Sequence, residues 1–277
     1  MITADQMHAF QQYLLEEERS CATMEKYLRD IRQFSAWADH RPISKGTVAQ
    51  WKEHLLAQCY SPSTINAKLT ALDRFLSFSG LESCRVKHLR VQRQLFREDR
   101  RELSKQEYHR LLDAAAAAGK ERLALLMETI CATGIRVSEL RYITVQAVQN
   151  GKAQIALKGK IRTILLPGKL CRKLSKYAGK NKIASDEIFL TRGGKPLSRK
   201  QIWAEMKALC RAAGVDDSKV FPHNLRHLFA RVFYQICHDV VKLADTLGHS
   251  SIETTRIYLI STGTEHIRTL EQLRLVS

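Results

Sequence analysis

Apolar residues recur at helical spacing through the first eighty residues of the chain. Four stripes fall within residues 7–14, 24–38, 48–55 and 69–78, and each predicts an amphipathic helix. The fourth helix has the clearest boundaries, because Ser61 can cap it, Pro62 suits its first turn and Gly80 follows as a stop. Ser20 is a candidate cap for the second helix. The pattern therefore predicts a small helical domain over residues 1–90.

The next segment, residues 91–103, has the composition of a linker. Its sequence, VQRQLFREDRREL, is rich in charge and poor in core-forming residues. A charged helix face is the alternative interpretation. Ser104 with Glu107 then forms a capping box that predicts the start of a new helix. We therefore place a linker at 91–103 and a second domain at 104–277.

The second domain mixes helical and strand-like patterns. Helices are predicted over about 105–118 and 121–132, and Gly134 ends the second of them. GKAQIALKGKIRTILLP alternates apolar and polar residues around a short turn, which predicts a hairpin or a small three-stranded sheet. Further helix signals are Ser198 with Gln201, a stop at Gly214, Pro222, and a capping box of Ser250 with Glu253. This last box places Tyr258 a little under two turns into its helix. The predicted fold class is mainly α, with a small antiparallel sheet.

Charge indicates the kind of partner. The 277 residues carry a formal net charge of +17, of which residues 1–90 contribute +2 and residues 104–277 contribute +14. Such an excess favours a polyanionic partner, because lysines and arginines that face phosphates release condensed counterions. A merely soluble basic protein or a ribosome-bound one is the alternative. We expect the C-terminal domain to make the strongest contacts with the polyanion.

Several other classes of protein lose support. The seven cysteines include no CxxC pair, so they predict reduced, mostly buried thiols rather than a zinc site or disulfides. There is no signal-peptide pattern and no apolar run of about 18 residues, which predicts a cytoplasmic protein without a membrane span. GxxxxGK[ST], GxGxxG and an acidic cluster are missing, so nucleotide hydrolysis and two-metal nuclease chemistry are disfavoured. No cofactor and no metal are predicted.

Five residues of the second domain have the side chains that metal-free phosphoryl transfer needs. A tyrosine that attacks a phosphodiester needs cations around the non-bridging oxygens and imidazoles for its protons. The candidates are Arg136, His223, Arg226, His249 and Tyr258. Taken one at a time, a core tyrosine, structural ion pairs and core histidines would explain them as well.

The order of the motifs resembles a known family. TGIRVSEL, LKGKIR, PHNLRH and LGHSSIETTRIY follow one another as in the tyrosine recombinases of the lambda-integrase and Xer type, and the chain looks close to their short bacterial integrases. SCATMEKYLRDIRQFSAW and SPSTINAKLTALDRFLSF resemble the family's helical, SAM-like core-binding domain. The resemblance implies a four-helix core-binding domain followed by an α-rich catalytic domain.

The resemblance also implies a role for each candidate. Tyr258 would be the nucleophile, leaving a 3′-phosphotyrosyl link and a free 5′-hydroxyl without ATP or metal. Arg136 and Arg226 would clamp the non-bridging oxygens, which suit a guanidinium fork. His223 would handle protons, and His249 would be a second hydrogen-bond donor to the phosphate.

Further residues of these motifs also receive assignments. Glu139 resembles the family's acidic residue that holds an arginine or histidine in place. The family's leaving-group acid is a hairpin lysine: keeping the Lys–Gly pair in register favours Lys158, whereas counting back from Arg162 favours Lys160, and a solvated lysine is the alternative. His227 is expected to point elsewhere on its helix and to be structural.

Partners follow from the same resemblance. Double-stranded DNA is the implied substrate, bound by a homo-tetramer across two duplexes and by a chain that is monomeric when free. The tail after Gly263 carries an apolar stripe, which either docks on a neighbouring subunit or folds back on its own domain; its members are Ile267, Leu270, Leu273 and Leu275.

The sequence predicts a site-specific recombinase, or integrase. One alternative is a topoisomerase IB-like or telomere-resolving enzyme, against which the short length and the Xer-like N-terminal domain argue. The other is a catalytically silent DNA-binding regulator, against which the intact set of five argues. The target site, the kind of mobile or chromosomal element, any accessory proteins and the side chains that read bases are left open.

Overall fold

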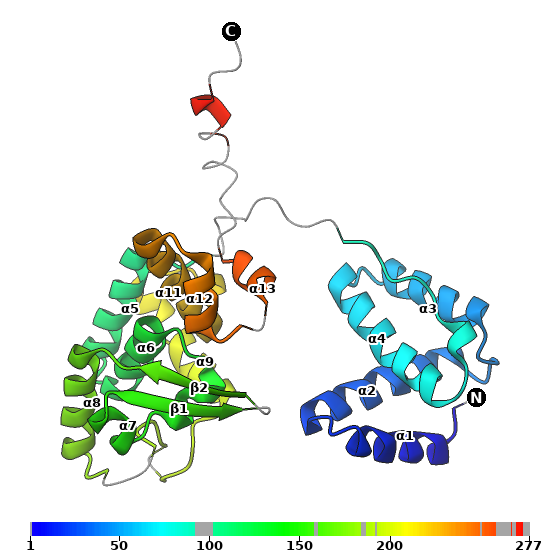
Figure 1. The fold of residues 1–277 in the computed structure, drawn as a ribbon, viewed down its shortest axis with the longest axis horizontal. Coiled ribbons are helices and arrows are strands. Elements are labelled where there is room, and N and C mark those ends of the chain that lie inside the picture. The colour runs from blue at the N-terminus through cyan, green and yellow to red at the C-terminus, as the bar shows by residue number, and fades with distance from the viewer. Residues whose placement is uncertain are drawn as a thin grey trace. The chain divides into compact units, whose positions relative to one another are not determined.

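The computed structural model describes residues 2–91, 102–157, 160–183, 187–191, 193–249, 251–258, 267 and 270–273, apart from the side chains of residues 157 and 160. The chain forms two compact units, Met1–Arg93 and Gln94–Ser277 (Figure 1). The predicted linker falls largely outside the described residues. Its last residue, Leu103, is buried in the core of the C-terminal unit.

The N-terminal unit is a bundle of four helices. They are α1 (Ala4–Glu16), α2 (Cys21–Ala38), α3 (Lys45–Ala57) and α4 (Pro62–Phe78), followed by the short 3-10 helix η1 (Glu82–Cys84). Ser61 caps α4 by accepting a bond from the Thr64 amide, and Gly80 takes a left-handed conformation beyond its end, as predicted. Ser20 occupies the cap position of α2, but its side chain makes no capping bond.

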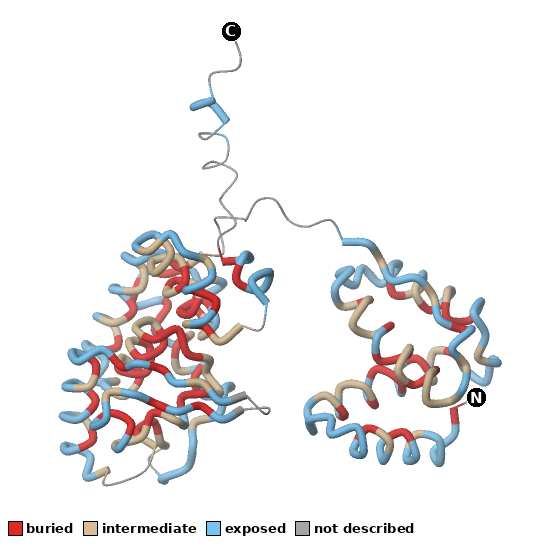
Figure 2. The backbone as a smooth tube through the Cα atoms, viewed as in Figure 1, coloured by how far each residue is buried: buried red, intermediate tan, exposed pale blue. Residues whose placement is uncertain are grey.

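Aromatic side chains fill the centre of this bundle. Phe10 and Phe75 meet edge to face with ring centroids 5.3 Å apart, and Trp51 packs against Phe34 at 5.9 Å. These four side chains are at most 2% exposed, whereas the outer helix faces are exposed (Figure 2). The amphipathic stripes of the sequence therefore form a single core in this unit.

The C-terminal unit is mainly helical with one antiparallel hairpin. Its first half contains α5 (Lys105–Ala117), α6 (Glu121–Thr133), η3 (Val137–Tyr142), α7 (Val145–Gln149), β1 (Lys152–Leu157) and β2 (Lys160–Leu165). Its second half contains α8 (Gly168–Lys180), α9 (Arg199–Lys207), α10 (Cys210–Ala213), η4 (Asp217–Lys219), α11 (Pro222–Cys237), α12 (Val240–Leu247) and α13 (Ile252–Arg256).

The hairpin register follows from its alternation. Lys152 pairs with Leu165 and Leu157 with Lys160, so two residues, 158 and 159, connect the strands. Ala153, Ile155 and Ile164 point into the core, which leaves the other face of the sheet exposed. The sheet has two strands among the described residues, so the hairpin alternative is confirmed there.

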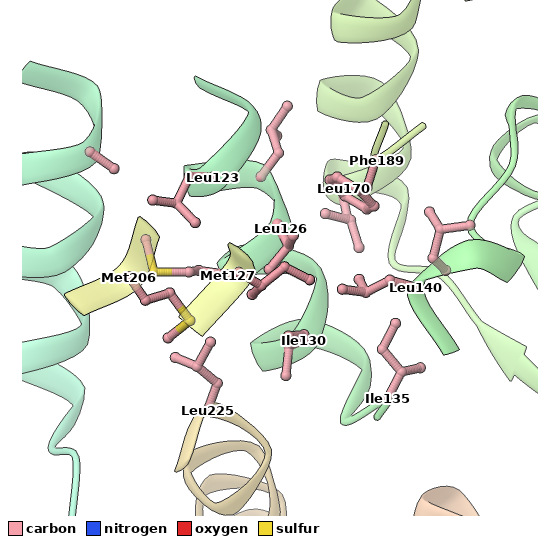
Figure 3. Close-up of a cluster of buried hydrophobic side chains, with 14 of the residues drawn as sticks. Leu123, Leu126, Met127, Ile130, Ile135, Leu140, Leu170, Phe189, Met206 and Leu225 are labelled. Carbon is pink, nitrogen blue, oxygen red and sulfur yellow. The ribbon is translucent and has the colours of Figure 1, made fainter. Parts of the chain in front are cut away.

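The core of the C-terminal unit is built around α6. Leu126, Met127 and Ile130 of this helix are at most 1% exposed, and α6 packs against α5, α8 and α11 (Figure 3). A central helix that is apolar on most of its surface can hold the elements around it in fixed positions. The start of α11 and the turn after α6 are therefore held next to each other.

Three sequence-based expectations are corrected. Gly214 ends α10, a separate short helix, because the chain leaves α9 after Lys207. Ser251 rather than Ser250 caps α13, which ends at Arg256, so Tyr258 lies in the turn beyond the helix and not within it. Of the seven free cysteines only Cys84 and Cys210 are buried, so the expectation of mostly buried thiols is wrong. Among the described residues, no helix is long and apolar enough to cross a bilayer.

Candidate active site

The five candidate residues lie around one cavity. This cavity, of about 700 Å³, is lined by Arg136, His223, Arg226, His249 and Tyr258. They come from the turn after α6, the first two turns of α11, and the segment from the end of α12 to just beyond α13. Residues separated by more than 120 positions in the sequence thus share one site.

Gly134 shapes the turn that carries Arg136. It ends α6 with a φ of +65°, and a Cβ at this position would lie 2.4 Å from Cδ1 of Phe229 on α11. A side chain there would be strained by the backbone and blocked by that ring. The close approach lets the Gly134 carbonyl accept a hydrogen bond from Arg226.

Glu139 is a buried carboxylate that holds two arginines. Only 1% of the residue is exposed. Its Oε1 accepts a bond from Arg136 Nη1 at 3.0 Å, and its Oε2 accepts from the Arg136 backbone amide at 2.7 Å and from Arg162 Nη2 at 2.6 Å. Arg136 keeps 39% of its side chain exposed toward the cavity. Glu139 therefore fixes one arginine that faces the cavity and one that lies behind it.

Arg162 of β2 connects the hairpin to Glu139 and Arg136. The sequence analysis did not assign it this role. Besides Glu139 it binds the Thr246 carbonyl, with Nη1 at 3.0 Å from the oxygen. Its side chain lies against Gly248, where an added Cβ would be 2.5 Å from Arg162 Cδ. The sequence signal was the arginine that closes LKGKIR. Arg162 links β2 to the turn that precedes His249.

Arg226 is a cation in the interior of the unit. It is 1% exposed, and its Nη2 lies 2.8 Å from both the Leu247 carbonyl and Nε2 of His249. Burial and the nearby Arg136 lower its pKa to about 10, and a hydrogen bond with Tyr258 acts in the opposite direction. The guanidinium therefore stays charged at neutral pH.

The tautomer of His249 follows from its partners. A guanidinium can only donate, so Nε2 of His249 accepts from Arg226, and Nδ1 carries the proton and donates to Oγ1 of Thr255 at 2.7 Å. Burial, together with Arg226, Arg136 and Arg162, lowers the pKa of His249 to about 4. Thr255 is fully buried and was not singled out in the sequence. It orients a neutral imidazole at the edge of the cavity.

Tyr258 is enclosed by three imidazoles. Its ring stacks on His249 with centroids 5.7 Å apart and meets His227 edge to face at 4.5 Å, and the His223 centroid lies 6.2 Å away. The expectation for His227 is corrected here: because it follows His223 by four residues, both rings lie on one face of α11, 4.5 Å apart. Only 3% of Tyr258 is exposed.

The site carries an excess of positive charge. Three guanidiniums, those of Arg136, Arg162 and Arg226, lie around the Glu139 carboxylate. Burying cations without matching anions is unfavourable, so the site gains from binding an anion. Two further cations, Arg199 and Lys200 of α9, line the cavity together with Trp203. Lys158 lies outside the described residues, and of Lys160 only the paired backbone is described.

Known proteins share this organisation. The phage integrase family matches residues 101–264, and the N-terminal SAM-like domain of phage integrases matches residues 7–82. The tyrosine recombinase XerA of Thermococcus kodakarensis is 29% identical over 95% of this chain and 93% of its own length. The chain belongs to the phage integrase family, and it is a site-specific tyrosine recombinase, an enzyme that breaks and rejoins DNA.

Solved structures show the same fold. A lambda integrase dimer bound to a core site has a TM-score of 0.73, with 18% identity over 93% of this chain and 95% of that one. A lambda integrase tetramer bound to a Holliday junction has a TM-score of 0.71, with 19% identity over 92% of this chain and 76% of that one. The mainly helical fold with an N-terminal SAM-like domain and a small sheet is thereby confirmed.

Proposed function

We propose that this recombinase cleaves duplex DNA by attack of the Tyr258 hydroxyl on a phosphodiester held in the cavity. The observation that carries the proposal is the position of this tyrosine, hydrogen-bonded to the buried Arg226 and surrounded by three imidazoles. The tyrosyl oxygen forms a bond to phosphorus, the bond to the 5′-oxygen breaks, and a 3′-phosphotyrosyl link remains. Attack by the freed 5′-hydroxyl of another strand reverses the step and releases Tyr258.

A bound phosphate supplies negative charge that balances the excess of arginines in the site. Arg136 and Arg226 donate to its non-bridging oxygens, and their fixed positions cost little reorganisation as charge develops in the transition state. An anion beside His249 favours the imidazolium, so Nε2 gains a proton and donates to the phosphate while Nδ1 stays bonded to Thr255. Glu139 acts through Arg136 by holding it in place.

The nucleophile must lose its proton during attack. His223 lies on the wall of the cavity, and His227 contacts both His223 and Tyr258. Imidazole is the side chain that most often accepts or donates a proton in general acid–base catalysis. We assign proton handling to His223, with His227 packed between it and the tyrosine.

The leaving 5′-oxygen needs a proton, which we assign to Lys158 with Lys160 as the alternative. Lys158→Ala is expected to slow cleavage of ordinary DNA by roughly 10²-fold, as for a lost general acid. A 5′-bridging phosphorothioate should restore most of the rate, since sulfur leaves without a proton. Lys152→Ala, at the opposite end of the hairpin, is the matched control and should cleave normally. Rescue of Lys160→Ala instead of Lys158→Ala would exchange the two assignments.

We propose that the enzyme works in the cytoplasm, as a monomer when free and as a homo-tetramer on two DNA duplexes. Support comes from the solved lambda integrase tetramer bound to a Holliday junction. A surface for assembly is offered by the C-terminal tail, where Ile267, Leu270 and Leu273 are 57%, 52% and 54% exposed. Apolar side chains left half-exposed in one chain are suited to dock on a neighbouring subunit.

The function is tested with two duplexes of different length that carry the same site, obtained from the DNA that flanks the coding region. The full chain should produce recombinant lengths, whereas a topoisomerase-like enzyme would reseal only the parental ones. A chain ending at Gly263 should melt at an unchanged temperature and bind a single site, yet form no recombinants. Earlier melting of the truncated chain would show that the tail folds on its own domain, and continued recombination would remove its role in assembly.

A further inference from the structure

One segment of the C-terminal unit is rich in basic residues and contains no acidic ones. Residues 140–185 contain eleven lysines and arginines and no aspartate or glutamate. Five of the eleven lie on α8, namely Lys169, Arg172, Lys173, Lys176 and Lys180. No residue of α8 lines the cavity, and α8 lies at the edge of the unit opposite α13 (Figure 1).

These five side chains form a single stripe, here called the α8 stripe. The other four follow Lys169 by three, four, seven and eleven residues. In a helix with 3.6 residues per turn, this spacing places all five on one face. The opposite face is apolar and buried, through Leu170, Leu174 and Ala178. The stripe extends for roughly 16 Å along the surface at 1.5 Å per residue.

Acidic neighbours neutralise only part of the stripe. Lys173 binds Glu128 at 2.5 Å and Lys180 binds Glu121 at 2.7 Å, both on α6. The other three, Lys169, Arg172 and Lys176, are exposed, and none of the ion pairs among the described residues includes them. Three cationic groups on one face are therefore available to a partner.

The stripe is unfavourable for the helix itself. Like charges three or four residues apart repel, and α8 contains several such pairs, among them Lys169 with Arg172 and Arg172 with Lys176. Lys169 also lies in the first turn, where the helix dipole disfavours a cation. Helices α5, α6 and α9 of the same unit mix acidic and basic residues instead. A solvated helix gains nothing from such a stripe, whereas a polyanion would remove the repulsion.

We propose that the α8 stripe is a second surface for duplex DNA, which binds the phosphate backbone without regard to sequence. Duplex backbone suits the stripe because it presents a regular line of negative charges. Single strands are less suitable, since their binding depends on exposed aromatic rings, and Tyr177, the one aromatic residue of α8, is partly buried near Glu121 and Arg122. The exposed face also lacks the aromatic anchors that dominate protein interfaces. DNA outside the cleavage site, or a second duplex, would occupy this surface.

The test is the salt dependence of binding to a random-sequence 60-bp duplex, measured by fluorescence anisotropy. The triple variant Lys169→Gln, Arg172→Gln, Lys176→Gln should bind more weakly, and its slope of log K against log salt should fall by roughly 2 to 3, at about 0.9 per lost phosphate contact. Its melting temperature should be unchanged or higher, because repulsion is relieved. Binding does not require cleavage, so this result is independent of the role of Tyr258.

A matched triple variant separates the stripe from net charge. Lys105→Gln, Lys120→Gln and Arg211→Gln remove the same charge from scattered positions of the same unit and should leave the slope nearly unchanged. An equal fall in both variants, or no fall in the α8 variant, would overturn the proposal. The proposal would also be overturned if the α8 variant lost binding to poly-L-glutamate while its binding to the duplex was unchanged. That result would assign the stripe to an acidic protein.

Discussion

Replacing Tyr258 by phenylalanine is expected to abolish the covalent protein–DNA adduct while leaving fold and DNA binding intact. The phenylalanine ring keeps the packing against His227 and His249, and only the hydroxyl that interacts with Arg226 is lost. A suicide substrate, nicked beside the cleavage position so that the short strand diffuses away, traps the adduct on a denaturing gel. The wild-type chain should form the adduct without added metal.

The matched control for this substitution lies in the same cluster. Tyr234 on α11 packs against the hydrophobic group that includes Tyr258, but it does not line the cavity. Tyr234→Phe should form the adduct at a near-normal rate. An adduct with the Tyr258→Phe chain, or a strict need of the wild type for magnesium, would refute the assignment of the nucleophile.

The second large effect is expected at Arg226. Lysine keeps the charge but cannot reach the Gly134 and Leu247 carbonyls and His249 together, so the phosphate loses a fixed donor. Cleavage by Arg226→Lys should fall by about 10²–10³-fold, the usual effect of removing one transition-state donor. Arg122→Lys is the control, because this partly buried arginine also binds a carbonyl and a carboxylate but lies outside the cavity. Normal cleavage by Arg226→Lys would argue against a phosphate clamp.

A titration separates the electrostatic role of Arg226 from a purely structural one. Positive charge on Arg226 is one of the causes that lower the pKa of His249 to about 4. In Arg226→Gln that charge is gone, so the imidazolium is less disfavoured and the pKa of His249 should rise. It should stay below the ordinary value of 6.5, because burial is the larger cause. NMR titration of the His249 ring measures the shift, and an unchanged pKa would mean that the two groups do not interact in solution.

The sequence determined most of the local structure. The capping boxes at Ser104 and Ser198 lie where helices begin, since their reciprocal bonds involve residues only three positions apart. Gly134 ends α6 for a local reason as well, because the left-handed conformation favours glycine. Alternation predicted strands around a short turn, as a hairpin or a three-stranded sheet, and the described residues form the hairpin. Five of the residues that line the cavity could also be predicted from their types and motifs.

Tertiary structure decided which groups meet across the chain. The sequence predicts that His227 points away from the site, because its neighbour Arg226 occupies another face of α11, yet the turn after α13 brings Tyr258 against it. Arg162 and Thr255 look like ordinary hairpin and helix residues, and only the packing of β2 and α13 against the end of α12 joins them to Glu139 and His249. Such contacts depend on the path of the whole backbone, whereas caps, turns and alternation depend on a few neighbouring residues. The sequence thus specified which chemical groups the site contains. The fold set the distances between these groups and the protonation state of His249.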